Sequence, residues 1–474
     1  MKLEDFLVQE YNYNKDIKDN MQTYIDQWKS WYVGDVKEFH NYYVYNGNQK
    51  NYRRRFTMNM AKEISEDWAD ILWSEKCKIS MANDKSQEDF DSLAKELDLY
   101  SIISQSLEKS GAMGTEATVV SVYDLIKNED GMYLDVSNAK TRVDVVDVDW
   151  IYPLTWNNKG ITECAFGSNE FVGGQKYVVL SVHLLENGIY HIKNHLFKDT
   201  QGTLAEIEMK DNVMSDFDTK SDKPWFSVFK PPLTNNLFNN SPFGIPHYAN
   251  AIDSLKAVDI CFDALKNEIN DGRKRIFARA EMFNYDNGEE KLVFDPNDTT
   301  IYQLPSGATK EDFIQSDSDT LRTAQQIEAL NTNLNILGNK VGFGENHYHF
   351  DGTMLSTATA VVSSNSKMFR RKKKLEIGYQ EAIKNLIEGI CYVSSRFGIY
   401  TIDTEGMVIQ FDDSIIEDKE AESNRALREQ SAGLISKVEY RMKIFGETKE
   451  IAEEAIKTIK EEEPTVEDLI GGAE

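Results

Sequence analysis

Residues 239–275 decide the fold, and they read NNSPFGIPHYANAIDSLKAVDICFDALKNEINDGRKR. The first part is dense in Asn, Pro and Gly, which end regular structure and set a turn. After the turn, apolar residues recur at three- and four-residue spacing, which predicts a helix. One face of this helix is apolar, with Ile252, Leu255, Val258, Phe262, Leu265 and Ile269, and the other carries Asp253, Asp259, Asp263 and Glu268. Such a helix packs through its apolar face and presents a row of carboxylates on its polar face.

Two more helices are predicted downstream. The apolar stripe of the first runs over 321–341, after a start at Asp317 and Asp319, and the Gly- and His-containing loop 342–352 interrupts it. The second extends over 357–397 without a Pro. At 1.5 Å per residue it would be about 60 Å long, a length that usually serves a bundle or an assembly. Between the helix of 252–271 and that of 321–341, residues 276–315 predict a small α/β insertion, with strands at 275–282 and 291–294.

The pattern upstream changes from helical to extended. Three apolar stripes with helical spacing predict that the first hundred residues are helical. From residue 118 to about 230 the period becomes two, and Gly- and Asn-containing turns separate the segments. This predicts a mostly antiparallel β region with strands at 118–123, 133–136, 142–148, 177–185 and 189–197.

The end of the chain predicts a short strand and then charged helices. Residues 407–411 read as the strand, and Ser436 with Glu439 forms the capping box of a helix that Gly446 closes. Another helix is expected from Thr448 onward.

Length and composition set the class of protein. The chain has 474 residues, a formal net charge of −26 and 41% hydrophobic residues, so several globular units are expected. A clamp that grips nucleic acid through its phosphates is usually basic, and the acidic balance disfavours one. The acidic N-terminus and the absence of a long apolar run predict no signal peptide and no membrane span. Four isolated cysteines predict reduced, mostly buried thiols in a protein made in the cytoplasm.

Motifs that carry chemistry are missing from the sequence. It contains no G-x-x-x-x-G-K-[ST], G-x-S-x-G or H-E-x-x-H pattern. The pairs His347/His349 and His191/His195 lack a nearby acidic or Cys partner, so they read as surface histidines rather than metal ligands. We therefore expect no enzymatic activity, no cofactor and no metal.

One strong basic run lies inside the predicted long helix. Its members are Lys367, Arg370, Arg371, Lys372, Lys373 and Lys374, with no acid among 370–374. A solvated face is the usual explanation of such a run, and a contact with a subunit or a polyanion is the alternative. Because like charges four residues apart repel one another, we expect acids of a neighbouring subunit to lie opposite.

The order of these elements resembles the portal proteins of tailed bacteriophages, particularly those of long-tailed phages of Gram-positive hosts. The segments that carry the resemblance are IDQWKSWYVG at 25–34, NNSPFGI at 239–245, STATAVVSSNS at 356–366 and SAGLIS at 431–436. The resemblance implies an α+β fold with a mixed wing, a two-helix stem, a small α/β clip, one very long helix and a helical crown.

The resemblance also implies a domain map. On this map the wing is 1–243, the first stem helix 244–275, the clip 276–315 and the second stem helix 316–340. The tunnel loop is 341–356, with Phe343, Glu345, Asn346, His347, Tyr348 and His349. The long wing helix and its strand are 357–416, and the acidic crown is 417–474. Asp253, Asp259, Asp263 and Glu268 would face the channel, where their charge would repel DNA and let it slide.

The function that the resemblance implies is that of a portal ring, usually of twelve subunits, at one vertex of the capsid. Double-stranded DNA would pass through the ring during packaging and ejection. The implied partners are the terminase large subunit, a head-completion or adaptor protein, and the major capsid and scaffolding proteins. Assembly would take place in the host cytoplasm and the product would be part of the virion. The alternatives are another virion structural protein, such as a head-completion factor, and an acid/base hydrolase that uses paired carboxylates.

Overall fold

A computed structural model describes most of the chain. The described residues are 2–46, 49–123, 126–127, 133–135, 139–209, 213–271, 275–279, 301–304, 314–317, 321–350, 358–412 and 426–462. They form two compact units, one made of residues 1–352 with 370–411 and the other of 353–369 with 412–474. The mixture of helices and antiparallel sheets confirms the predicted α+β class.

The N-terminal part is helical, as its apolar periodicity predicts. Helices α1 (Leu3–Tyr11), α2 (Asp16–Val33), α3 (Lys37–His40), α4 (Met60–Leu72), α5 (Asp84–Leu97) and α6 (Leu99–Met113) follow one another. One prediction was wrong here, because strands β1 (Asn41–Asn46) and β2 (Gln49–Arg54) form a hairpin between α3 and α4. Its tyrosines and arginines carry no apolar period, so the helical stripes on either side concealed it.

The β region is antiparallel throughout its described strands, which confirms the prediction. The larger sheet has the order β12-β11-β10-β9-β8, and β13 also pairs with β11; the smaller has the order β14-β4-β7. The strands of the larger sheet are β8 (Ile151–Asn157), β9 (Gly160–Val172), β10 (Gln175–Glu186), β11 (Ile189–Thr200), β12 (Thr203–Ile207) and β13 (Asp216–Asp218). The smaller sheet contains β4 (Glu116–Tyr123), β7 (Lys140–Asp147) and β14 (Phe226–Phe229), and the short strands β5 (Ile126–Lys127) and β6 (Tyr133–Asp135) pair with each other.

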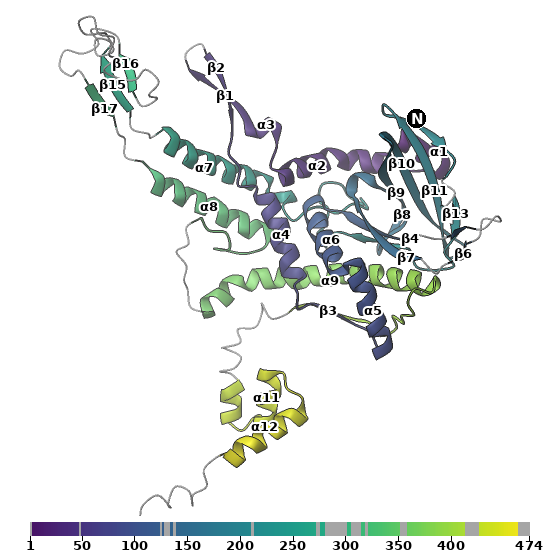
Figure 1. Ribbon diagram of the computed structural model, residues 1–474. Coiled ribbons are helices and arrows are strands. Elements are labelled where there is room, and N and C mark those ends of the chain that lie inside the picture. The colour runs from purple at the N-terminus through teal and green to yellow at the C-terminus, as the bar shows by residue number, and fades with distance from the viewer. Residues whose placement is uncertain are drawn as a thin grey trace, which may run out of the picture. The chain divides into compact units, whose positions relative to one another are not determined.

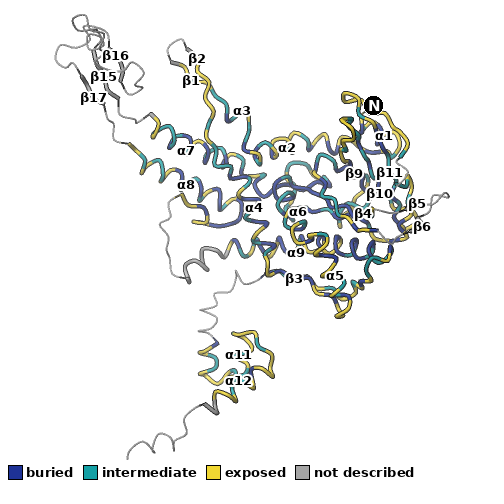
Figure 2. The backbone as a smooth tube through the Cα atoms, in the orientation of Figure 1, coloured by how far each residue is buried: buried dark blue, intermediate teal, exposed yellow. Residues whose placement is uncertain are grey.

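Helix α1 closes the core of the larger sheet. Phe6 and Leu7 from α1 pack with Val178, Leu180 and Phe197 from β10 and β11, and all five are buried. Figure 2 shows α1 next to β10 and β11. The ring of Phe6 meets that of Phe197 edge-on at 4.9 Å between centroids. Alternate residues of a strand point to the same face, so the period of two in 177–185 supplies this core directly.

Helices α7 (Ile252–Asp271) and α8 (Thr323–Val341) pack against each other in the first unit (Figure 1). Between them in sequence, β15 (Arg275–Arg279) pairs in parallel with β16 (Ile301–Leu304) and antiparallel with β17 (Ile314–Asp317). The strand predicted at 275–282 is thus present in part, whereas 291–294 lies outside the described residues.

The long helix is α9 (Ala358–Arg396), almost as predicted. At Gly378 the segment that contains Pro232 passes very close to α9. A Cβ added to Gly378 would lie 2.4 Å from the side chain of Pro232. Only glycine fits there, because real Cβ atoms do not approach other heavy atoms so closely. The predicted strand after the helix is β18 (Val408–Gln410), which pairs with β3 (Lys78–Ser80).

Short helices make up much of the described part of the second unit after residue 426. In α11 (Lys437–Phe445), Ser436 and Glu439 make both hydrogen bonds of the predicted capping box, and Gly446 ends the helix in the left-handed conformation. Arg441 binds Glu447 through two hydrogen bonds of 2.7 and 2.8 Å ahead of α12 (Lys449–Glu462).

Two further expectations concern cysteine and the membrane. All four cysteines are free, and all but Cys261 are buried, which confirms the expected pattern. None of the helices in the described part of the chain combines the length and apolar character that a bilayer crossing requires.

Candidate functional site

The four carboxylates of α7 that were expected to face a channel lie in three different environments. Asp253 is exposed, with 90% of its side chain accessible, and pairs with Lys256 at 3.1 Å. Glu268 accepts hydrogen bonds from the backbone and guanidinium of Arg322, which lowers the pKa of its carboxyl. Asp259 and Asp263 are buried, with 2% and 7% of each residue exposed.

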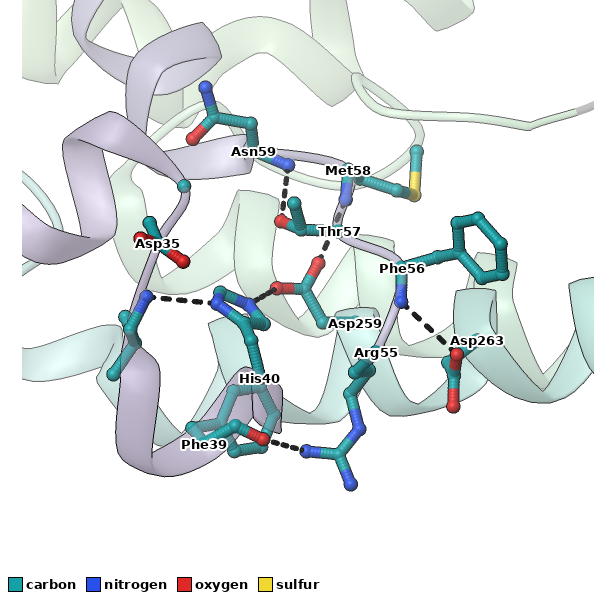
Figure 3. A network of polar contacts seen from close by, with 12 residues as sticks. Asp35, Phe39, His40, Arg55, Phe56, Thr57, Met58, Asn59, Asp259 and Asp263 are labelled. Atoms are coloured by element: carbon teal, nitrogen blue, oxygen red, sulfur yellow. Dashed lines mark hydrogen bonds and ion pairs between the residues drawn. The ribbon is translucent and has the colours of Figure 1, made fainter. Parts of the chain in front are cut away.

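Buried Asp259 is held from two sides (Figure 3). One carboxylate oxygen lies 3.1 Å from Nε2 of His40, and the other accepts a hydrogen bond from the Met58 backbone N–H at 2.9 Å. The other ring nitrogen of His40, Nδ1, accepts from the Val36 N–H at 2.9 Å. Because Nδ1 is an acceptor, a neutral His40 carries its hydrogen on Nε2. This N–H donates a hydrogen bond to Asp259.

Asp263 repeats this arrangement one helical turn later. It accepts from the Phe56 backbone N–H, the Tyr42 hydroxyl and the Asn267 amide, each at 3.1 Å. Residues four apart rise about 6 Å along a helix, and residues two apart in an extended chain span about 6.6 Å. The carboxylates of Asp259 and Asp263 therefore lie at a spacing that suits two backbone amides two residues apart, those of Met58 and Phe56.

This geometry corrects the expectation that Asp259 and Asp263 face a channel. Both are covered by the segment 36–59 of the same chain, and their oxygens are occupied by hydrogen-bond donors from that segment. A buried carboxylate is retained where such bonds compensate the loss of water. Helical periodicity places these aspartates beside the apolar stripe, on the polar side of the helix, but it does not show that another segment lies over them.

The segment after α8 is also packed rather than free over its described part. Phe343 is fully buried, and its ring stacks at 4.4 Å on Trp68 of α4 and at 4.2 Å on His347. Trp68 in turn donates its indole N–H to the Val341 carbonyl at 3.2 Å. The expectation of a projecting tunnel loop is therefore corrected for Phe343, which is a core residue.

Tyr348 is the second anchor of this segment. It is 9% exposed, and its hydroxyl donates to Asp67 of α4 at 2.7 Å. Burial, together with the negative charge of Asp67, raises the pKa of Tyr348 well above its usual range. His347 also approaches Asp67, at 3.6 Å between Nε2 and Oδ2. Glu345, Asn346 and His349 are exposed, and residues 351–356 lie outside the described part of the structure.

The basic run divides into exposed and covered members. Lys367, Arg370, Lys373 and Lys374 are exposed. Lys372 is fully buried and forms an ion pair with Glu376 one turn along the same helix. Arg371 is half-buried, and burial lowers the pKa of its guanidinium. The expectation that the whole run contacts a neighbour is thus corrected for Lys372, whose partner is in its own helix.

The histidine pair in β11 is not arranged as a metal site. His195 contacts Glu206 through Nδ1 at 2.7 Å and Tyr11 through Nε2 at 2.6 Å. His191 lies 3.9 Å from Asp216. Within the residues that the structure describes, no three His, Cys, Asp or Glu side chains gather as metal ligands.

Sequence reasoning missed the partners of these side chains. His40, Tyr42, Asp67 and Trp68 lie far in sequence from the segments they contact, and no local pattern connects them. The one available signal was the pair Asp259 and Asp263 at a spacing of four, adjacent to the apolar stripe of α7.

The comparison with protein families decides what kind of protein this is. The family described as "Phage portal protein, SPP1 Gp6-like" matches residues 12–467. The chain belongs to the phage portal protein family. Portal proteins of this family are structural and non-enzymatic, which confirms the expectation that the chain is not an enzyme and makes the hydrolase alternative wrong.

Two solved structures are similar to this portal protein at low identity. One, "Virion of native gene transfer agent (GTA) particle", is 10% identical, with a TM-score of 0.36 over 81% of this chain and 88% of that one. The other, "Neck of native GTA particle computed with C12 symmetry", is 10% identical, with a TM-score of 0.35 over the same shares. No curated protein matches the sequence.

Proposed function

We propose that copies of this portal protein assemble into a closed ring of twelve at one vertex of a phage capsid. Double-stranded DNA passes through the ring during packaging and ejection. The observation that carries the proposal is the family match, which spans nearly the whole chain.

The surface of the paired helices α7 and α8 supports assembly. Ile260 of α7 and Ile336 of α8 are each nearly half exposed in the single chain. Asp253, Lys256 and Ile260 share one face of α7, because they follow one another at three- and four-residue spacing. In a ring of identical subunits, the same mixed surface meets its neighbour at every repeat.

Asp253 is the carboxylate of α7 best placed to line the channel. It is the most exposed of the four, and its ion-pair partner Lys256 is itself partly exposed. A ring of such aspartates would repel the phosphates of DNA and prevent tight binding. Glu268 contributes less charge to such a surface, because Arg322 neutralises it.

The proposed domain map keeps its order, with one change. The wing, two stem helices, clip, long helix and crown are proposed at the boundaries given above. The tunnel loop is reduced, since Phe343 and Tyr348 belong to the core. The part proposed to enter the channel is 349–356, most of which lies outside the described residues.

The proposed partners follow from this role. The clip would receive the terminase large subunit, which supplies the energy of packaging, and a head-completion or adaptor protein after packaging. Major capsid and scaffolding proteins would surround the wing. Assembly would take place in the host cytoplasm, and the mature ring would belong to the virion.

Electron microscopy and native mass spectrometry of the purified chain test the ring. We expect rings with a central hole wide enough for duplex DNA, and masses that correspond to eleven to thirteen subunits. Monomers and dimers alone, across a wide range of concentration and salt, would contradict the proposal.

A further inference from the structure

The β1–β2 hairpin forms a sheet of its own. Its six residue pairs join β1 only to β2, and neither strand belongs to another described sheet. A two-stranded hairpin is at most marginally stable alone in water. A partner is therefore expected to cover part of it.

One face of the hairpin is aromatic and basic. Tyr43 pairs with Tyr52 and Tyr45 with Lys50, so these four side chains point to the same side. The three tyrosines are 53%, 59% and 69% exposed, in the order Tyr43, Tyr52 and Tyr45. Lys50 lies over the ring of Tyr43, with its ammonium 3.8 Å from the ring centroid. Exposed tyrosines in such a cluster are typical of the centres of protein interfaces.

The base of the hairpin is held firmly, which presents this face in a fixed direction. Before the hairpin, His40 contacts Asp259, and within β1 the Tyr42 hydroxyl donates to Asp263. After it, the amides of Phe56 and Met58 bind the same two carboxylates. Both ends of the hairpin are thus tied to α7, and less conformational entropy is lost when a partner binds.

Charge identifies the partner as another copy of this chain. Residues 41–55 contain Lys50, Arg53, Arg54 and Arg55 and no acid, so they carry +4. The rest of the chain therefore carries −30, since the whole chain carries −26. A second subunit offers this strongly complementary surface, and the tyrosines can be buried against it.

Helix α4 shows that acids are available on the surface of such a copy. Glu63, Glu66 and Asp70 are exposed and follow one another at three- and four-residue spacing, with Asp67 beside them. Burial and then the charges of Asp67 and Glu66 raise the pKa of the Glu63 carboxyl. Such crowded carboxylates gain stability when a cation from a neighbour approaches.

DNA is the less favourable partner for the hairpin. DNA that moves through a channel must not be held, and twelve aromatic and basic arms would hold it through phosphates and bases. An interface between subunits has no such conflict.

We propose that the aromatic and basic face of the β1–β2 hairpin docks on the acidic surface of the adjacent subunit and holds neighbouring subunits together. The proposal rests on the ring of the proposed function and adds the element that links its members. It makes Tyr45 and Tyr52 the central contact residues, with Lys50 and Arg54 on the same face at their edge.

Photo-crosslinking tests the contact directly. Benzoylphenylalanine replaces Tyr45 in the full chain, and light- and heavy-isotope subunits are mixed before assembly, without DNA. We expect crosslinked peptides that join a light to a heavy subunit. The matched control places the probe at Phe171, an exposed aromatic at 72% in β9, where we expect at least ten-fold less product between subunits. Crosslinks from position 45 only within one chain, or no enrichment over position 171, would overturn the proposal.

Charge reversal tests the contribution to assembly. We expect Lys50→Glu with Arg54→Glu, two changes on the docking face, to raise the concentration needed for half-assembly about ten-fold or more, as loss of a central contact does. The control, Lys159→Glu with Lys198→Glu, changes the net charge equally at exposed positions of the larger sheet. Equal assembly of the two variants would overturn the role of the hairpin while leaving the ring intact. A wild-type chain that forms no ring would instead overturn the proposed function, and the hairpin's partner with it.

Discussion

His40 and Asp259 lie 3.1 Å apart in the core, although 219 residues separate them in sequence. This pair ties the segment that precedes the β1–β2 hairpin to helix α7. Asp263 and the amides of Phe56 and Met58 complete the connection. Sequence periodicity places Asp259 and Asp263 toward solvent, but in the portal subunit they connect the segment 36–59 to α7. We call this connection the buried joint.

Replacement of Asp259 tests this joint. Asp259→Ala leaves the Nε2–H of His40 and the N–H of Met58 buried without an acceptor. We expect the free energy of unfolding to fall by about 3 kcal/mol, measured by thermal or urea unfolding. Asp253→Ala, on the same helix but exposed, is the control and should change stability by less than about 0.5 kcal/mol. Equal effects of the two substitutions would argue against the buried joint.

Phe343→Ala distinguishes a core segment from a projecting loop. The substitution removes a ring that stacks on Trp68 and His347, and a buried aromatic lost to Ala costs about 3–5 kcal/mol. Phe350→Ala is the control, since Phe350 is 40% exposed and lies in the same segment. Thermal unfolding of both variants measures the difference. A variant at 343 as stable as wild type would restore the interpretation of residues 342–348 as a free loop.

The basic run should separate into a stability effect and an assembly effect. Lys372→Ala removes the buried ion-pair partner of Glu376, which then keeps only the exposed Lys373 at 3.1 Å, so we expect a lower melting temperature. Arg370→Glu with Lys374→Glu should leave the melting temperature unchanged, because both side chains are exposed, and should lower ring yield before DNA is present. Native mass spectrometry measures that yield, and Lys384→Glu, exposed on the same helix, is the control. Normal rings from the double variant at physiological salt would exclude a subunit contact for these two residues.

Glu116 should make stability depend on pH. Its carboxylate is fully buried in β4, and burial raises its pKa to about 8. Because this folded pKa exceeds the unfolded value, the stabilising contribution is complete below about pH 4.5 and is lost as pH rises to about 8. Glu116→Gln should therefore reduce the fall in melting temperature between pH 5 and pH 8.5, and exposed Glu88→Gln should not. An unchanged pH profile in Glu116→Gln would show that another group titrates.

The sequence by itself determined the class of elements along the chain. Periods of 3.6 and 2 residues located α7, α8, α9 and part of the antiparallel strands, among them β4, β7, β10 and β11, because each element repeats its buried face at a fixed spacing. They did not locate β8 and β9, which complete the larger sheet. The capping box of Ser436 and Glu439 was equally readable, since both partners lie within one helical turn. The order of the elements was sufficient to recognise the portal family.

Only the tertiary structure decided which polar faces are covered. Asp253 and Asp259 look alike in sequence, yet the first is exposed and the second is buried beneath residues 36–59. Phe343 reads as part of a Gly-rich loop until Trp68, 275 residues earlier, is placed against it. Periodicity reports which residues share a face of an element, whereas burial depends on a second segment whose distance along the chain leaves no local pattern. The packing of remote segments therefore assigned Asp259, Phe343 and Lys372 to the core of the portal subunit.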